Sequence, residues 1–163
     1  MKLFQSYVND HQRSFLSKST IPVDASNNTE DNQREYELFK KILANHKELD
    51  KEPWGMISWK FQHKCLINPE SFIEYALSKF DSGYDCVFIN PMIGNEALYM
   101  NVWEQGAHCG HVGLDKIATY LANELGGRIT AIMGKKSFAF CNYFIASPIF
   151  WKKYIEFTDH ALD

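Results

Sequence analysis

Short apolar runs and longer amphipathic stretches alternate along the chain. Runs rich in β-branched and aromatic residues predict strands, because they are bounded by turn residues and are short. These runs cover residues 3–8, 54–61, 86–89 and 137–146, and residues 21–24 are expected to form a short extended piece. Apolar residues at helical spacing predict helices over 31–44, 69–80, 114–125 and after Pro148. Strands that alternate with helices predict an α/β fold, a layered αβα arrangement around a mainly parallel central sheet, with residues 1–163 in a single domain.

Local signals mark where some of these elements begin and end. Asn68-Pro69-Glu70 combines an N-cap amide, a proline at the first helical position and an acid in the first turn. Gly126-Gly127 ends the helix over 114–125. The charged stretch 45–52 predicts a solvated linker between the helix over 31–44 and the strand over 54–61.

The candidate chemistry gathers after the strand predicted at 86–89. Four consecutive apolar residues predict burial on both faces of the sheet, and Asn90-Pro91 ends the strand because proline lacks a backbone N–H. Ligand sites in α/β sheets lie beyond the carboxyl ends of the strands. The polar segment that follows, which its glycines predict to be a loop, therefore supplies the first candidates. They are Asn90, Trp103, Glu104, His108, His111 and Asp115.

Glu104 is the candidate catalytic base. A carboxylate beside an aromatic platform, here Trp103, is an arrangement that sugar chemistry uses for proton transfer. The structural alternative is a solvated glutamate next to a core tryptophan.

The pair His108 and His111, with Cys109 between them, has the chemistry of metal ligands. On a helix the two imidazoles would face each other, with Asp115 about one turn further. A zinc site needs three or four ligands, and the sequence has no second His/Cys pair. We therefore expect no metal and favour imidazoles that contact phosphate or sugar hydroxyls.

A basic cluster ends the strand predicted at 54–61. Lys60, His63 and Lys64 follow Trp59, and they predict a site that neutralises phosphate. The alternative is a core tryptophan with solvated strand-end lysines. Asn142 lies within the apolar run 137–146, so we expect a buried amide that joins a structural network or lines the site.

Composition excludes several classes. The net charge of −3 and the absence of a long basic run argue against nucleic acid as a partner. The four cysteines have no paired spacing, no apolar leader follows Met1-Lys2, and no apolar run reaches the ~20 residues of a membrane span. We expect free thiols and a cytoplasmic location. No P-loop, GxGxxG, GxSxG, HExxH or CxxC motif is present.

Read together, four segments resemble the small glycosyltransferase-like domains of bacterial lipopolysaccharide and capsule gene clusters, which have the GT-A fold. They are the first strand with IPVDASNN, NQREYELFKKIL running into WGMISWKF, YDCVFINP with the NVWEQG and HxxHxxxD loop, and FCNYFIASPIFWKKYIEF. The resemblance implies a transferase that moves a sugar from a nucleotide donor to a glycan or lipid-linked acceptor in polysaccharide biosynthesis, with peripheral membrane association.

One departure from that family concerns the metal site. GT-A enzymes usually carry an Asp-x-Asp after a central strand, whereas here the strand ends Ser58-Trp59-Lys60. The resemblance therefore implies metal-independent binding of the donor, or a domain that binds sugar or nucleotide without transfer. A zinc-binding protein using His108 and His111 is a further alternative.

The resemblance also implies roles for the candidate residues. The nucleotide would lie near Asp24, Asn27 and Asn28, and the diphosphate would face the cations of the basic cluster. Glu104 would act as base, and His108, His111 and Asn142 would contact the sugar.

Overall fold

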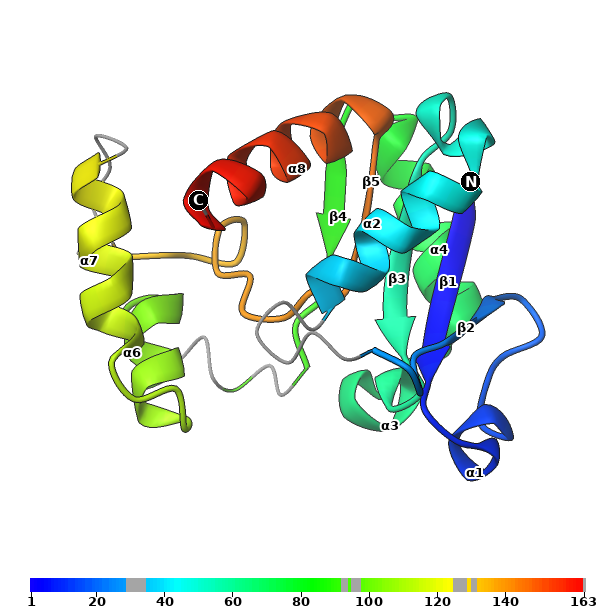
Figure 1. The fold of residues 1–163 in the computed structure, drawn as a ribbon, viewed down its shortest axis with the longest axis horizontal. Coiled ribbons are helices and arrows are strands. Elements are labelled where there is room, and N and C mark those ends of the chain that lie inside the picture. The colour runs from blue at the N-terminus through cyan, green and yellow to red at the C-terminus, as the bar shows by residue number, and fades with distance from the viewer. Residues whose placement is uncertain (29–34, 92–93, 95–97, 125–128, 130–131, 163) are drawn as a thin grey trace. The chain divides into compact units, whose positions relative to one another are not determined.

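The computed structural model describes residues 1–28, 35–91, 94, 98–124, 129 and 132–162, and these form two compact units (Figure 1). Unit 1 comprises Met1–Ile89 and Asn142–Asp163, and unit 2 comprises Asn90–Cys141. No helix among the described residues is long and apolar enough to cross a membrane. The prediction of a single domain stays a prediction, since two compact units can belong to one domain.

Unit 1 is built on a five-stranded open sheet in the order β2-β1-β3-β5-β4. Its strands are β1 (Lys2–Tyr7), β2 (Ile21–Asp24), β3 (Trp54–Ser58), β4 (Cys86–Phe88) and β5 (Phe144–Ala146). β1 pairs in parallel with both β2 and β3, whereas β5 is antiparallel to β3 and to β4. The α/β class and the mainly parallel sheet are therefore confirmed, with β5 as the reversed strand.

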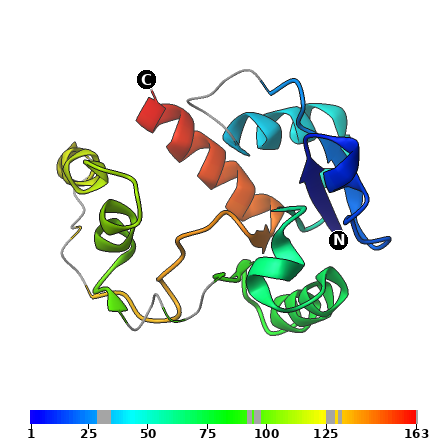
Figure 2. The ribbon, with the colours of Figure 1, turned by 90° about the horizontal axis from the view of Figure 1, so that it is seen from below.

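Helices cover both faces of this sheet (Figures 1 and 2). One face carries α2 (Glu35–Asn45) and α8 (Pro148–Leu162), and the other carries α3 (Phe61–Cys65) and α4 (Pro69–Phe80). The remaining helices of unit 1 are the short α1 (Asp10–Arg13) and the 3₁₀ helix η1 (Lys47–Asp50). The expected start of α4 is confirmed, because the Asn68 side chain accepts a hydrogen bond from the Ser71 N–H at 2.8 Å.

Stacked aromatic side chains form the core on the α2/α8 face. The rings of Trp54 and Trp151 are parallel with centroids 3.9 Å apart, and the indole N–H of Trp151 donates to the Trp54 carbonyl at 2.9 Å. Phe39 of α2 meets the Trp151 ring edge-on at 5.0 Å. Burying each such side chain contributes roughly 1.5–3 kcal/mol, so this face holds α2, α8 and the sheet together.

The opposite face explains why β3 is shorter than predicted. The strand was expected to run to residue 61, but it ends at Ser58 and α3 begins at Phe61. The Phe61 ring is fully buried, stacked on Phe72 at 5.5 Å and edge-on to Tyr143 at 5.4 Å. Packing of this ring under α4 overrides the strand preference of the local sequence.

Three further predictions in unit 1 were wrong. The stretch 45–52 contains η1 rather than only linker, because Leu49 is buried in the core. The run 137–146 is a strand only from Phe144. β4 is not buried on both faces: as an edge strand, it leaves Cys86 and Phe88 half-buried. The start of the helix predicted over 31–44 and the end of the helix predicted over 114–125 fall outside the described residues.

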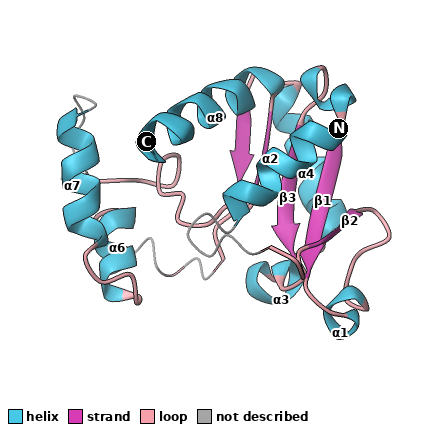
Figure 3. Ribbon diagram, in the orientation of Figure 1, coloured by secondary structure: helices cyan, strands magenta, loops and turns pink. Residues whose placement is uncertain are grey.

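Unit 2 contains α6 (Val102–His108) and α7 (Leu114–Glu124), which pack against each other (Figure 3). The prediction of a loop over NVWEQG was wrong, because α6 occupies it. Gly106 lies inside α6 for a packing reason: a Cβ there would lie 2.4 Å from Cδ2 of Leu114. The glycine therefore indicates close contact between two helices rather than a turn.

Candidate functional site

The carboxyl ends of β1 and β3 lie where the direction of the chain path across the sheet reverses. From β1 the chain continues to β2 on one side, and from β3 it continues through α3 and α4 to β4 on the other. In open α/β sheets ligands bind at such a reversal, outside the carboxyl ends of the strands. The topology therefore singles out the edge of the sheet formed by the carboxyl ends of its parallel strands, not the outer strands β2 and β4.

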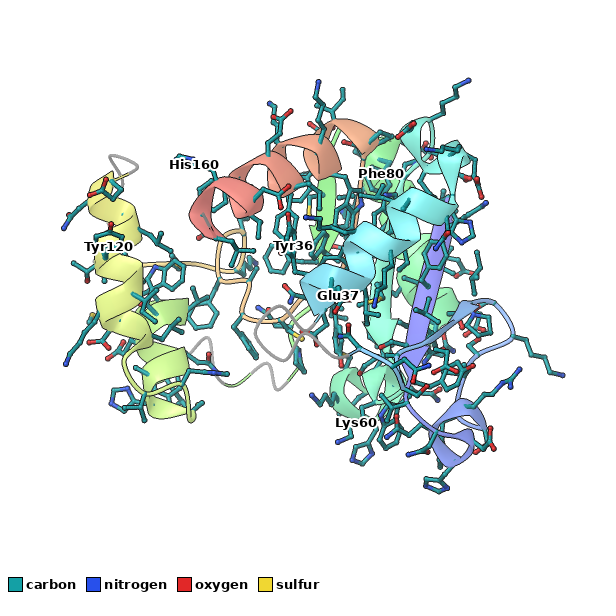
Figure 4. The ribbon with its side chains drawn as sticks, in the orientation of Figure 1. Tyr36, Glu37, Lys60, Phe80, Tyr120 and His160 are labelled. Atoms are coloured by element: carbon teal, nitrogen blue, oxygen red, sulfur yellow. The ribbon has the colours of Figure 1, made fainter. Side chains whose placement is uncertain are left out.

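Aromatic rings and cations gather at this edge. The Arg13 guanidinium lies over the Tyr7 ring at 5.6 Å, and the Lys60 ammonium lies over the Trp59 ring at 5.1 Å. The Phe15 ring is 5.8 Å from Trp59, which links the connection after β1 with the segment after β3. Lys60 is exposed at the start of α3 (Figure 4). Flat π-faces next to cations suit an anionic ligand that also carries a ring.

Asp24, at the end of β2, supplies a carboxylate to the same edge. Its side chain accepts a hydrogen bond from the Ser26 N–H at 2.9 Å. Hydrogen bonds from the side chain and backbone of Ser26, together with the positive charge of Arg13, hold the pKa of Asp24 below its ordinary value. Because its pKa is lowered, Asp24 is an ionised acceptor at neutral pH, suited to hydroxyl or N–H donors of a ligand.

A buried glutamine fixes the backbone beneath this edge. Gln5 is 1% exposed; its Oε1 accepts from the Ser17 N–H at 2.9 Å and the Thr20 hydroxyl at 2.8 Å, and its Nε2 donates to the Ser58 carbonyl at 3.3 Å. The Ser58 hydroxyl in turn hydrogen-bonds the Tyr143 hydroxyl. The connection after β1 and the end of β3 are thereby tied to one support.

The structure brings most of the predicted unit 1 residues to this edge. Asp24, Trp59 and Lys60 lie at the strand ends, His63 and Lys64 are exposed on α3, and Asn27 and Asn28 lie in the turn after β2. These residues share one end of the sheet. Lys60 follows β3 as the N-cap of α3, and His63 and Lys64 lie on this helix rather than at the end of a strand.

Asn142 also lies toward this edge, but not as predicted. It lies two residues before Phe144, which pairs with Met56 near the carboxyl end of β3. Its side chain is exposed and it precedes β5, so the expectation of a buried strand amide was wrong. Tyr143, its neighbour, is the buried polar side chain that joins a network.

Sequence reasoning missed Tyr7, Arg13 and Phe15. All three follow or end the first strand, so the rule that ligands bind beyond carboxyl strand ends could have found them. Phe15 is 55% exposed, which is unusual for an aromatic side chain in a chain with an available core.

Unit 2 holds the remaining predicted residues, and local capping explains several of them. The buried Asn101 is the N-cap of α6: its Oδ1 accepts from the N–H groups of Trp103 at 3.1 Å and Glu104 at 3.0 Å. Its amide donates to the Ile129 carbonyl at 3.0 Å. Glu104 accepts from the N–H of Met100, the residue before this N-cap, at 2.7 Å, so one carboxylate oxygen of the predicted base is engaged at the start of α6.

The two histidines do not face each other on one helix. His108 is the last residue of α6, and His111 lies in the turn beyond it, after Gly110 with its positive φ of 109°. The His108 Nδ1 lies 2.9 Å from the Glu104 carbonyl oxygen, which leaves its Nε2 available. His111 and Asp115 are both exposed.

Asn90 has a structural role within unit 2. Its Nδ2 donates to the Phe138 carbonyl, and its Oδ1 accepts from the Phe140 N–H at 3.3 Å. Phe138 is fully buried, so the amide holds the segment that carries this ring. Both ends of the Asn90 side chain are therefore occupied.

In the described part of the chain, no three His, Cys, Asp or Glu side chains gather in a way that could hold a metal ion. The expectation of no metal, and the zinc alternative, both stay predictions. Cys65, Cys86, Cys109 and Cys141 form no disulfide bond, as expected. Burial raises the pKa of the Cys86 thiol to about 12.

A groove of about 500 Å³ lies elsewhere in unit 1. Its floor is apolar, with Leu43, Leu49 and Trp151, and charged side chains such as Lys152 and Glu156 line it as well. It adjoins η1 and the start of α8, at the amino end of β3, and it contains none of the predicted site residues. The cluster of rings and charges at the opposite end of the sheet therefore remains the stronger candidate site.

Comparison of the chain with protein-family models, with curated proteins and with solved structures found no match.

Proposed function

We propose that the protein is a cytoplasmic glycosyltransferase of the GT-A type that binds a nucleotide-activated sugar and transfers it to a cell-surface glycan precursor, without an Asp-x-Asp metal site. The observation that carries this proposal is the group formed by Tyr7, Arg13, Asp24, Trp59 and Lys60 at the carboxyl end of the sheet. The resemblance of the sequence to glycosyltransferase-like domains supports the same substrate class.

The chemistry of this group matches the parts of a nucleotide diphosphate. The faces of Tyr7 and Trp59 would stack a base, and the ionised Asp24 would accept hydrogen bonds from ribose hydroxyls or base N–H groups. Arg13 and Lys60 would neutralise the diphosphate, which is the task of the metal in enzymes that carry Asp-x-Asp. Within unit 1, Asn142 would contact the sugar, and the sugar contacts expected of His108 and His111 in unit 2 stay predictions.

Glu104 remains the proposed base, with one carboxylate oxygen left to accept a proton. The other oxygen holds the N-terminus of α6 through the Met100 N–H. This hydrogen bond favours a second candidate function, a module that binds a nucleotide sugar without transferring it. A carboxylate that holds a helix N-terminus is less free to move towards a substrate and accept its proton. The two functions share the donor site and differ in turnover.

Donor binding can be tested by isothermal titration calorimetry with UDP-, GDP-, CMP- and TDP-sugars in the presence of EDTA. One of these donors should bind, and added salt should weaken binding. Lys60→Ala should lower the affinity about tenfold or more, since a charge-assisted contact to phosphate contributes about 1.5–3 kcal/mol. The melting temperature should hardly change, because the Lys60 side chain is exposed.

Lys79→Ala is the matched control. Lys79 also lies over an aromatic ring, that of Tyr75 at 5.0 Å, but on α4. Full affinity in Lys60→Ala, equal losses in both variants, or binding that requires Mn²⁺ or Mg²⁺ would each overturn the metal-independent donor site. Transfer by the wild type that is lost in Glu104→Gln, with donor affinity kept, would separate the transferase from the binding module.

A further inference from the structure

Leu66 stands out on the surface of unit 1. It follows α3 in the left-handed conformation, with φ of 59°, and is the sole non-glycine residue with positive φ in the part of the chain that the structure describes. Its side chain is 87% exposed. Glycine or asparagine usually occupies such a position at a helix end, because a Cβ is unfavourable there. The chain thus accepts backbone strain to present an apolar side chain to solvent, which points to a function for that side chain.

Other exposed apolar side chains belong to the same end of the sheet. Val8 and Phe15, in the connection between β1 and β2, are 46% and 55% exposed. The Phe15 ring lies 5.8 Å from Trp59, the residue that enters the turn before α3. Both α1 and α3 project beyond the carboxyl ends of β1 and β3 (Figure 1). Apolar side chains from two connections therefore project from one end of unit 1.

The charge of these two connections is opposite to that of the whole chain. Segments 8–19 and 59–66 contain three lysines, one arginine and one aspartate, a net charge of +3, whereas the chain has −3. The carboxylate of Asp24, at the same end of the sheet, lowers this local charge to +2. His63 lies in the second of these segments and adds charge when protonated. An anionic partner is therefore attracted to this end of the molecule in particular.

We propose that this end of unit 1 docks on the surface of an anionic lipid bilayer, with Leu66 and Phe15 inserted among the headgroups and Lys64 paired with lipid phosphates. Apolar side chains flanked by basic ones are the combination that interfacial membrane binding requires, since burial of apolar area adds to electrostatic attraction. RNA would use the cations and aromatic rings, but it offers nothing to a solvent-exposed aliphatic side chain such as Leu66.

This inference extends the proposed function, since a transferase acting on a lipid-linked acceptor works at a membrane. Vesicle binding needs no nucleotide sugar, however. The bilayer surface and the donor site can therefore fail independently, and each is tested without the other.

The test is co-sedimentation of the purified protein with vesicles of phosphatidylcholine, with and without phosphatidylglycerol, at low and high salt. The protein should bind the vesicles that contain phosphatidylglycerol, and salt should weaken this binding. Leu66→Asn should lower the affinity about tenfold by removing the inserted side chain, and its melting temperature should stay the same or rise because asparagine tolerates the left-handed backbone. Lys64→Glu should lower the affinity by about the same factor.

Two variants at other positions of unit 1 serve as controls. Leu77→Asn changes a leucine of α4 that is 47% exposed, and Lys51→Glu reverses an exposed charge next to η1. Both should keep wild-type vesicle binding. The proposal is overturned if the protein does not bind vesicles at low salt, or if it binds neutral vesicles equally well. Equal effects of Leu66→Asn and Leu77→Asn on vesicle binding would also overturn it. So would a protein that binds single-stranded RNA but no vesicles.

Discussion

The two units hold their candidate residues in different ways. In unit 1 the rings and charges project from the end of a sheet whose faces are packed with large aromatic side chains, Trp54 and Trp151 among them. Among the described residues of unit 2, the buried apolar side chains are small or isolated, as Ala118 and Phe138 show. The side-chain amides of Asn101 and Gln105 are buried as well. Tertiary packing therefore positions the first group, and local hydrogen bonds position the second.

This difference indicates which candidate residues can serve as fixed binding groups. A strand end is held by neighbouring strands and by the layer beneath, so Lys60 and Asp24 begin from a rigid backbone. A helix such as α6 is short, and its start depends on Asn101 and Glu104. Unit 1 therefore offers candidate groups on a fixed backbone, whereas the candidate groups of unit 2 depend on local capping.

The largest expected effect is that of Gly55→Ala in the centre of the sheet. A Cβ at this position would lie 2.0 Å from the Phe144 carbonyl oxygen and 2.9 Å from the Ile145 Cα, so the backbone of β5 would have to move. We expect a loss of about 3 kcal/mol or more in the free energy of unfolding, measured by urea denaturation. Gly134→Ala, where a Cβ meets no atom within 4 Å, is the control. A midpoint like that of the control would mean that β3 and β5 are not paired as described.

Cysteine labelling compares the units directly. Because the pKa of Cys86 in unit 1 is raised to about 12 by burial, little thiolate forms at pH 8, whereas Cys109 in unit 2 is exposed. Iodoacetamide should modify Cys109 at least about a hundredfold faster, as followed by mass spectrometry of proteolytic peptides. The difference should disappear in denaturant. Comparable rates in the native protein would show that β4 opens readily and would weaken the contrast between the units.

Removal of the α6 cap should have a moderate effect. In Asn101→Ala the N–H groups of Trp103 and Glu104 and the Ile129 carbonyl all lose their partner. We expect a loss of about 1–2 kcal/mol, seen as faster amide hydrogen exchange in α6. Exchange in β1 and β3 should be unchanged, and acceleration there as well would mean that the two units unfold together.

Gly106→Ala should have the smallest effect on stability, although a Cβ at Gly106, like one at Gly55, would lie too close to a neighbouring atom. The added Cβ meets a terminal methyl group of Leu114, which can rotate away, and alanine favours a helix by about 1 kcal/mol over glycine. The melting temperature should therefore change by only a few degrees. A loss as large as that of Gly55→Ala would show that unit 2 is packed as rigidly as the sheet.

Sequence patterns predicted elements better than they predicted where the elements end. Hydrophobic periodicity located β1, β2, α4 and α8, because each carries a regular apolar face or a clear cap such as Asn68. The end of β3 was missed because the burial of Phe61 is decided by distant partners, Phe72 and Tyr143, which no local pattern contains.

Only part of the candidate site was predicted, because the rest also depends on distant partners. The residue types that bind phosphate were recognisable in 59–64, but their association with Arg13 and Asp24 depends on the order of strands in the sheet. The prediction that Glu104 is a catalytic base stays a prediction: its carboxylate accepts from the Met100 N–H at the start of α6, and a glutamate at a helix start and a reactive carboxylate look alike in sequence. The order of the strands, rather than residue type, decides which charges meet.

The distribution of tryptophans gives the protein its own optical probes. Trp54 and Trp151 are buried and stacked with parallel rings at 3.9 Å, so their coupled transitions should dominate the near-ultraviolet circular dichroism and report on the integrity of unit 1. Trp59 lies beside Lys60 at the sheet edge, where a stacked base would quench its emission. Trp103 is half-buried in α6 and reports on unit 2. Single replacements by phenylalanine would therefore let folding, ligand binding and helix opening be followed separately in one unlabelled molecule.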